Sequence, residues 1–331
     1  MNELISIVMP VKNAASYLSD CLESILAQTY KNWELLAIND SSEDASLAIL
    51  KDYAQRDRRI KVNENKGQGI IPALQCAYAL SEGKYVTRMD ADDKMGKEKL
   101  ELMYAALKKK GRGHVAVGLV EYFSISSLGD GYSKYAMWLN KLTTAGRNFD
   151  EIYKECPIPS SCWMLSRNDF EKVGAFNSEL YPEDYDLAFR LKQYNFQIIP
   201  ITSILHYWRD HPERTSRNDN NYADNSFIQI KVKYFLEEDY NEKCQLVVWG
   251  AGNKGKKLAK TLTECNVDFR WVCNNNNKIG HSIYGKVLQP MELLNDNKTM
   301  QVIVTISGEH DTAGINQFVN NKQQHAFYRF S

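Results

Sequence analysis

Apolar runs alternate with segments of helical spacing along the first hundred residues. Residues 4–11 form a nearly continuous apolar run, which is typical of a strand buried on both faces. Residues 13–28 place apolar side chains three and four positions apart, as in a helix with one buried face. The alternation predicts a mostly parallel α/β sheet flanked by helices. Further strands are predicted at 33–38, 60–62 and 83–87, and further helices at 45–55 and 72–80.

Polar residues directly follow several of these strands. Val11, Asp40 and Asp90 fall at three predicted carboxyl ends, where parallel α/β sheets bind ligands. Asp92 and Asp93 follow Asp90 closely, and like charges at this spacing repel one another unless a cation offsets them. The cluster therefore predicts a divalent ion held through oxygen. A solvated acidic turn is the alternative.

The middle of the chain is less regular. A strand is predicted at 115–123 and a helix at 132–142. Pro182 stands at the start of a third segment, and acids follow it in what would be the first turn of a helix. We expect this helix to extend to about residue 194.

The strand–helix pattern starts again near residue 244. Strands are predicted at 244–249, 267–273 and 301–306, with a helix before residue 265. We therefore expect a second, smaller domain of Rossmann-like α/β type. The expected organisation is a first domain over 1–219, a connecting helix or linker over 220–243 and the second domain over 244–331.

Three glycines in the second domain resemble a nucleotide-binding fingerprint. Gly250, Gly252 and Gly255 follow a strand and begin a helix, so a phosphate could approach the helix N-terminus. The acid expected after the next strand is absent, and Cys273 and Asn274 occupy its place. The three glycines mark a candidate second nucleotide site, and a module that only mediates contacts is the alternative.

Composition excludes some classes of protein. Lys plus Arg and Asp plus Glu both number 41 among 331 residues, which argues against a nucleic-acid binder driven by bulk positive charge. No apolar run reaches the length of a membrane span, and the first residues lack a signal-peptide pattern. The seven scattered cysteines indicate reduced thiols. We expect a cytoplasmic location, with peripheral attachment at the inner face of the membrane as an alternative; a homo-oligomer stays open.

Six motifs occur in order between residues 4 and 217. The most specific reads Arg88-Met89-Asp90-Ala91-Asp92-Asp93. The motifs lie at 6–13, 28–34, 38–42, 83–93, 183–190 and 207–216. Together they resemble the landmarks of family 2 glycosyltransferases, which have the GT-A fold.

The resemblance implies a nucleotide-sugar donor across the strand ends. Asp40 would bond the base, commonly uracil, which favours a UDP-sugar. Asn39 and Ser41 stand where Asp and Gly are common in the family, so the base stays open. The donor-binding residues implied by the resemblance are Pro10, Val11, Asn39, Asp40, Lys66, Arg88, Asp90 and Ala91.

The resemblance also implies a divalent metal, Mn²⁺ or Mg²⁺. Asp92 would ligate the ion and His211 would reach it or the diphosphate. The ion would neutralise charge on the departing nucleotide. The alternatives are a structural role for His211 and, for Lys66 and Arg88, a role as surface cations.

Asp184 is the candidate catalytic base. A sugar hydroxyl attacks well only while its proton is being removed, and a carboxylate within reach can remove it. Direct attack at the anomeric carbon would invert its configuration. The alternative is that Glu183 and Asp184 only complement the dipole at the start of a helix.

These residues predict an inverting, metal-dependent glycosyltransferase. It would move a single sugar to a saccharide or lipid-linked acceptor in surface-glycan biosynthesis. A catalytically silent nucleotide-sugar-binding or scaffold protein is the alternative from another class. A nucleotidyltransferase shares the fold class and metal use, but it would release pyrophosphate.

Overall fold

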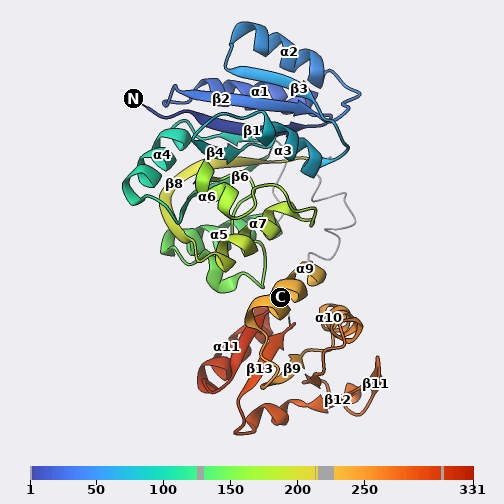
Figure 1. Cartoon of the computed structure of the whole chain (residues 1–331). Helices are drawn as coiled ribbons and strands as arrows, with labels where there is room; N and C mark the ends of the chain where they lie inside the picture. Colours follow the sequence, from blue (N-terminus) through green and yellow to red (C-terminus); the bar gives the residue numbers. More distant parts are fainter. Residues whose placement is uncertain (1, 125–129, 213, 215–226, 307–308) are drawn as a thin grey trace. The chain divides into compact units, whose positions relative to one another are not determined.

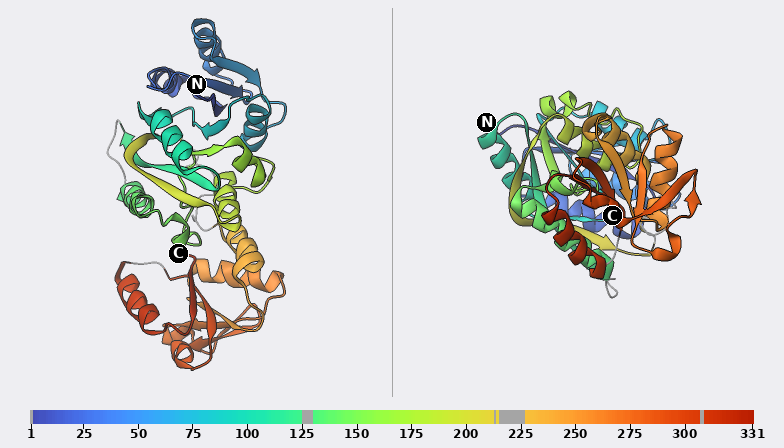
Figure 2. Two further views of the ribbon diagram at one scale, coloured as in Figure 1. Left: turned by 60° about the vertical axis from the view of Figure 1, so that its left-hand side comes forward. Right: turned by 90° about the horizontal axis from the view of Figure 1, so that it is seen from below.

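The computed structural model describes residues 2–124, 130–212, 214, 227–306 and 309–331. The chain divides into two compact units, which can be followed by sequence colour in Figure 2. The first unit comprises Met1–Asp150 with Cys156–Arg214, and the second comprises Glu151–Glu155 with Thr215–Ser331.

The domain boundaries expected from the sequence stay a prediction. The boundary between residues 219 and 220 lies within 215–226, outside the described residues. The described part of the expected connector, residues 227–243, groups with the second unit. It contains α9 (Ile228–Tyr234) and the π-helical turn η3 (Phe235–Asp239).

The described strands of the first unit form one sheet in the order β3-β2-β1-β4-β7-β6-β8-β5. Neighbours from β3 to β4 are parallel, β7 runs antiparallel to both of its neighbours, and β8 is parallel to β6. The strands span β1 Ile5–Val11, β2 Trp33–Asn39, β3 Ile60–Glu64, β4 Tyr85–Arg88, β5 Lys94–Met95, β6 His114–Ser124, β7 Trp163–Ser166 and β8 Gln197–Asp210.

Helices cover both faces of this sheet (Figure 1). Because β2 and β3 follow β1 in one direction across the sheet, right-handed crossovers put α1 and α2 on one face, and the return to β4 puts α3 on the other. The helices span α1 Ala15–Leu26, α2 Ser46–Arg56, α3 Ile70–Ala79, α4 Lys99–Lys110, α5 Asp130–Ala145, η1 Asn148–Glu151, α6 Arg167–Lys172 and α7 Glu183–Gln193.

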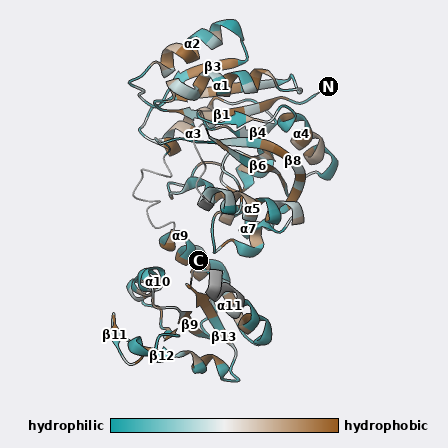
Figure 3. Cartoon of the chain, turned by 180° about the vertical axis from the view of Figure 1, so that it is seen from behind, coloured by the Kyte–Doolittle hydropathy of each residue, from teal (hydrophilic) through white to brown (hydrophobic). Residues whose placement is uncertain are grey.

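The core lies between the sheet and these helices. Every residue of β2 is buried, Glu34 and Asn39 included, as is typical of a central strand of a parallel sheet with helices on both faces. The buried face of α1 consists of Leu18, Cys21, Leu22 and Ile25, at the predicted helical spacing. Several strand segments are brown, that is hydrophobic, in Figure 3. The mixed α/β architecture confirms the predicted fold class.

The second unit has its own sheet, in the order β11-β12-β10-β9-β13-β14. From β12 to β14 the neighbours are parallel, as in a Rossmann-like arrangement. The elements are β9 Gln245–Trp249, α10 Asn253–Glu264, β10 Arg270–Cys273, η4 Asn276–Lys278, β11 Ser282–Ile283, β12 Lys286–Pro290, η5 Met291–Asn295, β13 Met300–Val304, α11 Glu309–Asn321 and β14 Ala326–Arg329.

Across the described ranges, no helix combines the length and the apolar character that crossing a membrane requires.

Candidate active site

The candidate site lies at the carboxyl ends of β2, β1 and β4, which are adjacent and parallel (Figure 1). Val11 ends β1 and pairs with Asn39 at the end of β2. The next residue, Asp40, donates its backbone N–H to the carbonyl oxygen of Val11 at 2.8 Å. The turn from Asp90 follows β4 at the same edge of the sheet. Parallel strands thus bring together residues that are distant in the sequence.

Asp40 holds a loop against this edge. Its carboxylate accepts hydrogen bonds from the side-chain amide of Asn65 at 2.6 Å and from the backbone N–H of Gly69 at 3.0 Å. The ammonium of Lys12 lies 3.5 Å from Asp40 Oδ2. Gly69 has a φ of 92°, which glycine adopts without the strain other residues incur. The buried carboxylate therefore shapes the loop over residues 65–69.

The other residues of the expected donor set have varied surroundings. Asn39 is buried, and its amide donates to Glu64 Oε2 at 2.8 Å. Ala91 is buried in the turn after β4, and Pro10 is partly exposed. Lys66 is exposed to solvent. The structure thus places Asn39, Pro10 and Ala91 close to the strand ends, and Lys66 on the surface of the adjoining loop.

Arg88 joins two acids that are far apart in sequence. Its Nε donates to Asp90 Oδ1 at 2.8 Å, and its NH1 donates to Glu183 Oε1 at 2.7 Å. The side chain of Arg88 is only 6% exposed and that of Glu183 is 8% exposed, so both charges are withdrawn from water. Burial alone would raise the pKa of Asp90, but the charge and hydrogen bond of Arg88, together with Ser161 and His206, outweigh it and lower that pKa.

Asp184 lies in the first turn of α7, beside Glu183. Burial, together with the neighbouring charge of Glu183, raises the pKa of Asp184 to about 7. The backbone N–H of Tyr185 donates to Asp184 Oδ1 at 2.7 Å and favours the ionised form. A carboxylate whose pKa lies near neutrality is suited to proton transfer.

Asp92 and His211 form the candidate metal-binding pair. Asp92 Oδ2 lies 3.0 Å from His211 Nε2, although the residues are 119 positions apart. The ring of Tyr17 packs on the imidazole with 4.4 Å between centroids. His211 Nδ1 is buried, and none of the described residues forms a hydrogen bond with it. Within the described ranges no group of three or more His, Cys, Asp or Glu side chains gathers around a common point.

The two side chains fit a divalent ion. Two neighbouring ligands of an octahedral ion at about 2.1 Å stand about 3 Å from each other. The separation of Asp92 Oδ2 and His211 Nε2 is 3.0 Å, so both can face one cation with little movement. A protein that supplies only two ligands leaves the remaining positions to phosphate oxygens and water.

Asp93, the third acid of the turn, points elsewhere. Its Oδ2 lies 2.9 Å from His206 Nε2, and its Oδ1 accepts from the backbone N–H of Arg209 at 2.8 Å. Burial raises the pKa of Asp93 and lowers the pKa of His206. Asp93 therefore attaches the turn to β8. His211 directly follows the last residue of this strand.

Ser160, Asn65 and Tyr17 are among the residues of the site that the sequence did not single out. Ser160 donates to Asp90 Oδ2 at 3.2 Å, Asn65 bonds Asp40, and Tyr17 packs on His211. The sequence placed Asn65 in a loop and Tyr17 on a helix, but nothing in either pattern shows which distant residue each contacts. Ser160 lies in a segment without regular periodicity.

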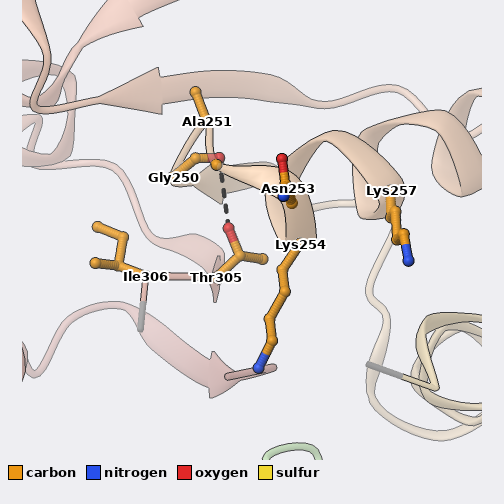
Figure 4. A pocket seen from close by; sticks show the side chains of 8 residues that line it. Gly250, Ala251, Asn253, Lys254, Lys257, Thr305 and Ile306 are labelled. Carbon is orange, nitrogen blue, oxygen red and sulfur yellow. Dashed lines mark hydrogen bonds between the residues drawn. The ribbon is translucent and has the colours of Figure 1, made fainter. Parts of the chain in front are cut away.

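Two of the three glycines of the second unit, Gly250 and Gly252, line a pocket of about 380 Å³ (Figure 4). Lys254 and Lys257 extend from α10 in different directions, and Thr305 closes another side with a hydrogen bond to Gly250 O at 3.4 Å. Asn274 stands where a nucleotide-binding fold has a carboxylate that binds the ribose. The side-chain oxygen of Asn274 does not take over this role, because it accepts a hydrogen bond from the indole of Trp249 at 2.8 Å. The second nucleotide site stays a prediction.

Two of these glycines have a packing explanation of their own. Gly250 has a φ of 121°, where other residues are strained. A Cβ on Gly255 would lie 2.1 Å from the carbonyl oxygen of Gly250. The close approach of α10 to its preceding loop therefore requires Gly at these positions whether or not a ligand binds.

Comparison with known proteins identifies relatives of this chain. The model of "Glycosyl transferase family 2" matches residues 6–174. An uncharacterized glycosyltransferase of Haemophilus influenzae is 33% identical over 71% of this chain and 75% of its own length. The glycosyltransferase GlyA of Streptococcus pneumoniae is 34% identical over 40% of this chain, and a putative teichuronic acid biosynthesis glycosyltransferase, TuaG of Bacillus subtilis, is 38% identical over 30%. The matched segment spans only 20% of GlyA and 39% of TuaG.

Solved structures share the fold at low identity. TarS 1-349 of S. aureus, in complex with UDP-GlcNAc, matches with a TM-score of 0.53 and 18% identity over 78% of this chain and 71% of its own. The mannosyltransferase PcManGT of Pyrobaculum calidifontis, in complex with GDP-Man and Mn²⁺, matches with a TM-score of 0.52 and 16% identity over 79% of this chain and 70% of its own. At this identity the likeness concerns the fold. The family match over residues 6–174 and the Haemophilus relative show that the chain belongs to glycosyl transferase family 2.

Proposed function

We propose that this protein is an inverting, metal-dependent glycosyltransferase that moves one sugar from a nucleotide-sugar donor to a saccharide or lipid-linked acceptor. One observation carries the proposal. Asp184, with a pKa raised to about 7, is joined through Glu183 and Arg88 to Asp90 at the strand ends. A carboxyl group of near-neutral pKa is thus connected, through ion pairs, to the candidate donor site.

The donor would lie along the ends of β1, β2 and β4. We assign its contacts to Pro10, Val11, Asn39, Asp40, Lys66, Asp90 and Ala91, whose positions at or beside these ends favour this role. Relatives of the same fold are described with UDP-GlcNAc and with GDP-Man. We favour a UDP-sugar for this chain. We assign Arg88 a different role below.

A divalent cation, Mn²⁺ or Mg²⁺, would be held by Asp92 and His211, and it would supply charge neutralisation to the diphosphate. The ring nitrogen of His211 that faces Asp92 is Nε2, at 3.0 Å. Tyr17 restrains the imidazole by ring contact.

The transfer step is a single displacement. The acceptor hydroxyl gives its proton to Asp184 as its oxygen forms a bond to the anomeric carbon of the donor. The bond between that carbon and the diphosphate oxygen breaks, and the nucleoside diphosphate leaves with the electron pair. Attack from the face opposite the leaving group inverts the configuration.

The acceptor class and the cellular site are further parts of the proposal. One relative is named for teichuronic acid biosynthesis, which favours a role in assembling a surface glycan. We place the reaction in the cytoplasm or at the inner face of the membrane, where activated sugars and lipid-linked acceptors meet.

Replacing Asp184 with Asn tests the proposal. Because Asn cannot accept the proton, turnover should fall roughly 100- to 10,000-fold while donor binding is kept. Release of nucleoside diphosphate is measured with purified full-length protein, and Asp150→Asn, at an exposed ion pair with Arg147, is the control.

Three results would contradict the enzyme proposal. A binding or scaffold protein would show no turnover in either form. A nucleotidyltransferase would release pyrophosphate. Full activity in Asp184→Asn would remove this residue from catalysis.

A further inference from the structure

The guanidinium of Arg88 forms two ion pairs inside the protein. It is the last residue of β4, and its two bonds run to different sides of the site, Nε to Asp90 and NH1 to Glu183. All three side chains are largely buried, with Asp90 the most exposed at 22%. Charge-assisted bonds of this length are among the stronger ones in proteins, and the planar fork of Arg fixes their direction.

These two bonds connect the donor side of the site to the helix that carries the base. Glu183 is 95 positions from Arg88 and directly precedes Asp184. Because both residues lie in the first turn of α7, any movement of Glu183 also moves Asp184. A buried carboxylate that lost a cation bonded to it at 2.7 Å would not stay in place at low cost.

We propose that Arg88 is a positioning residue of the transfer reaction, which bonds Asp90 and Glu183 at once and thereby sets where Asp184 stands relative to the donor. The inference rests on the proposed function, since it concerns the same base. It replaces the direct donor contact expected for Arg88 from the sequence, because its Nε and NH1 already serve protein carboxylates.

Electrostatics give the same bridge a second effect. The charged groups around Asp184 are Glu183 on its own helix and Arg88 and Asp90 from the end of β4. Burial and the charge of Glu183 raise the pKa of Asp184, whereas the charge of Arg88 lowers it. Arg88 therefore keeps the base ionisable near neutrality while Glu183 opposes this.

The two ends of the bridge should act in opposite directions on the base. Without the cation, in Arg88→Gln, the acid limb of the pH profile should move up by about one unit. Without the neighbouring anion, in Glu183→Gln, it should move down by a similar amount. If Arg88 and Glu183 were needed only for folding, the acid limbs of the two variants would not move in opposite directions.

The variant Arg88→Lys separates the effect of Arg88 on the position of Asp184 from the effect of its positive charge. Lysine keeps the cation but has a single nitrogen, so it cannot hold both carboxylates in one geometry. The acid limb should therefore stay near that of the wild type, while kcat falls about 100-fold because the base is misplaced. KM for the donor should change little, since no donor contact is lost.

The experiment compares the wild type with Arg88→Gln, Arg88→Lys and Glu183→Gln as full chains. Steady-state kinetics across pH give kcat, KM and the acid limb, and carbon-13 NMR of the Asp184 carboxyl gives its titration without turnover. Glu183→Gln preserves shape and supplies the test if Arg88→Gln does not fold.

Opposite shifts together with a lowered kcat in Arg88→Lys would support the bridge. The inference is overturned if the titration of Asp184 moves in neither variant, or if Arg88→Gln raises KM for the donor and leaves kcat unchanged. Absence of transfer by the wild type would refute the proposed function, while the NMR titration would still decide whether the bridge exists.

Discussion

At the residue scale, acids of one site have opposite electrostatic surroundings. The charge of Arg88 lowers the pKa of Asp90, whereas burial and Glu183 raise that of Asp184 to about 7. Two carboxylates with separated pKa values can take different roles at the same pH. This supports one acid that stays ionised beside the donor and another that accepts a proton.

The raised pKa of Asp184 has a consequence for stability. A carboxyl that binds its proton more tightly in the folded state adds stability at low pH and loses it as pH rises through the folded pKa. Between the ordinary value of 3.8 and about 7, folding should therefore weaken as Asp184 ionises.

Asp184→Asn should accordingly stabilise the protein at high pH. The gain over the wild type should be near zero at pH 4 and reach on the order of 1–4 kcal/mol above pH 8. Thermal unfolding at several pH values measures it. Asp186→Asn is the control on the same helix, and it should destabilise because Arg190 loses a carboxylate at 2.7 Å. Equal melting temperatures for wild type and Asp184→Asn at high pH would contradict the assigned environment.

The sequence could locate these residues but not their surroundings. The motif with Asp90 and Asp92 and the helix start with Asp184 are visible because their residues are neighbours in the chain. The link from Arg88 to Glu183 is not, since nothing local specifies a partner 95 positions away. The same holds for Asp93, which the sequence grouped with a metal cluster and the structure pairs with His206.

At the element scale, continuous patterns were predictable and interrupted ones were not. The strand predicted at 33–38 and the helical spacing at 13–28 correspond to β2 and α1. The long strand β8 was missed because many of its residues are exposed and Pro200 interrupts it. Its pairing with β6 is also irregular at Gly118 and Leu119, so no simple alternation marks it.

The loop between β9 and α10 allows a test of close packing. Gly255→Ala would place a Cβ 2.1 Å from Gly250 O, so the loop or the helix must shift. Overpacking of this kind costs about 1–3 kcal/mol. Hydrogen exchange of β9 and α10 in the full chain should show weaker protection.

Gly252→Ala is the matched control. Among the described residues, no heavy atom beyond its chain neighbours lies within 4 Å of a Cβ at this position, and its φ of −81° suits other residues. Protection should stay at the wild-type level. Equal protection in Gly255→Ala would show that the approach of α10 to Gly250 is looser than described.

At the scale of the whole molecule, the sequence indicated two α/β units because the strand–helix pattern starts again near residue 244. It gave no sign that Glu151–Glu155, from the middle of the chain, groups with the second unit. Tyr153 explains the grouping. Its hydroxyl bonds Asp239 at 2.5 Å and its ring stacks on Phe330 at 5.1 Å, and both contacts need the folded chain.

A screen of nucleotide sugars by thermal shift tests the donor assignment on the full chain. A donor at 100 times its Kd should stabilise the protein by about 2.7 kcal/mol, and a UDP-sugar with Mn²⁺ should give the largest shift. Asp92→Ala should lose the part of the shift that depends on Mn²⁺. A shift of equal size without metal, or one kept in Asp92→Ala, would contradict the assigned metal ligand.

The most direct measurement is a crystal structure of Asp184→Asn with Mn²⁺ and the donor that the screen identifies. If Asp92 and His211 hold the metal and Asp184 is the base, we expect one ion contacted by Asp92, His211 and the diphosphate, with the anomeric carbon facing residue 184. A donor bound only at the pocket beside Gly250, or a sugar turned away from residue 184, would contradict it.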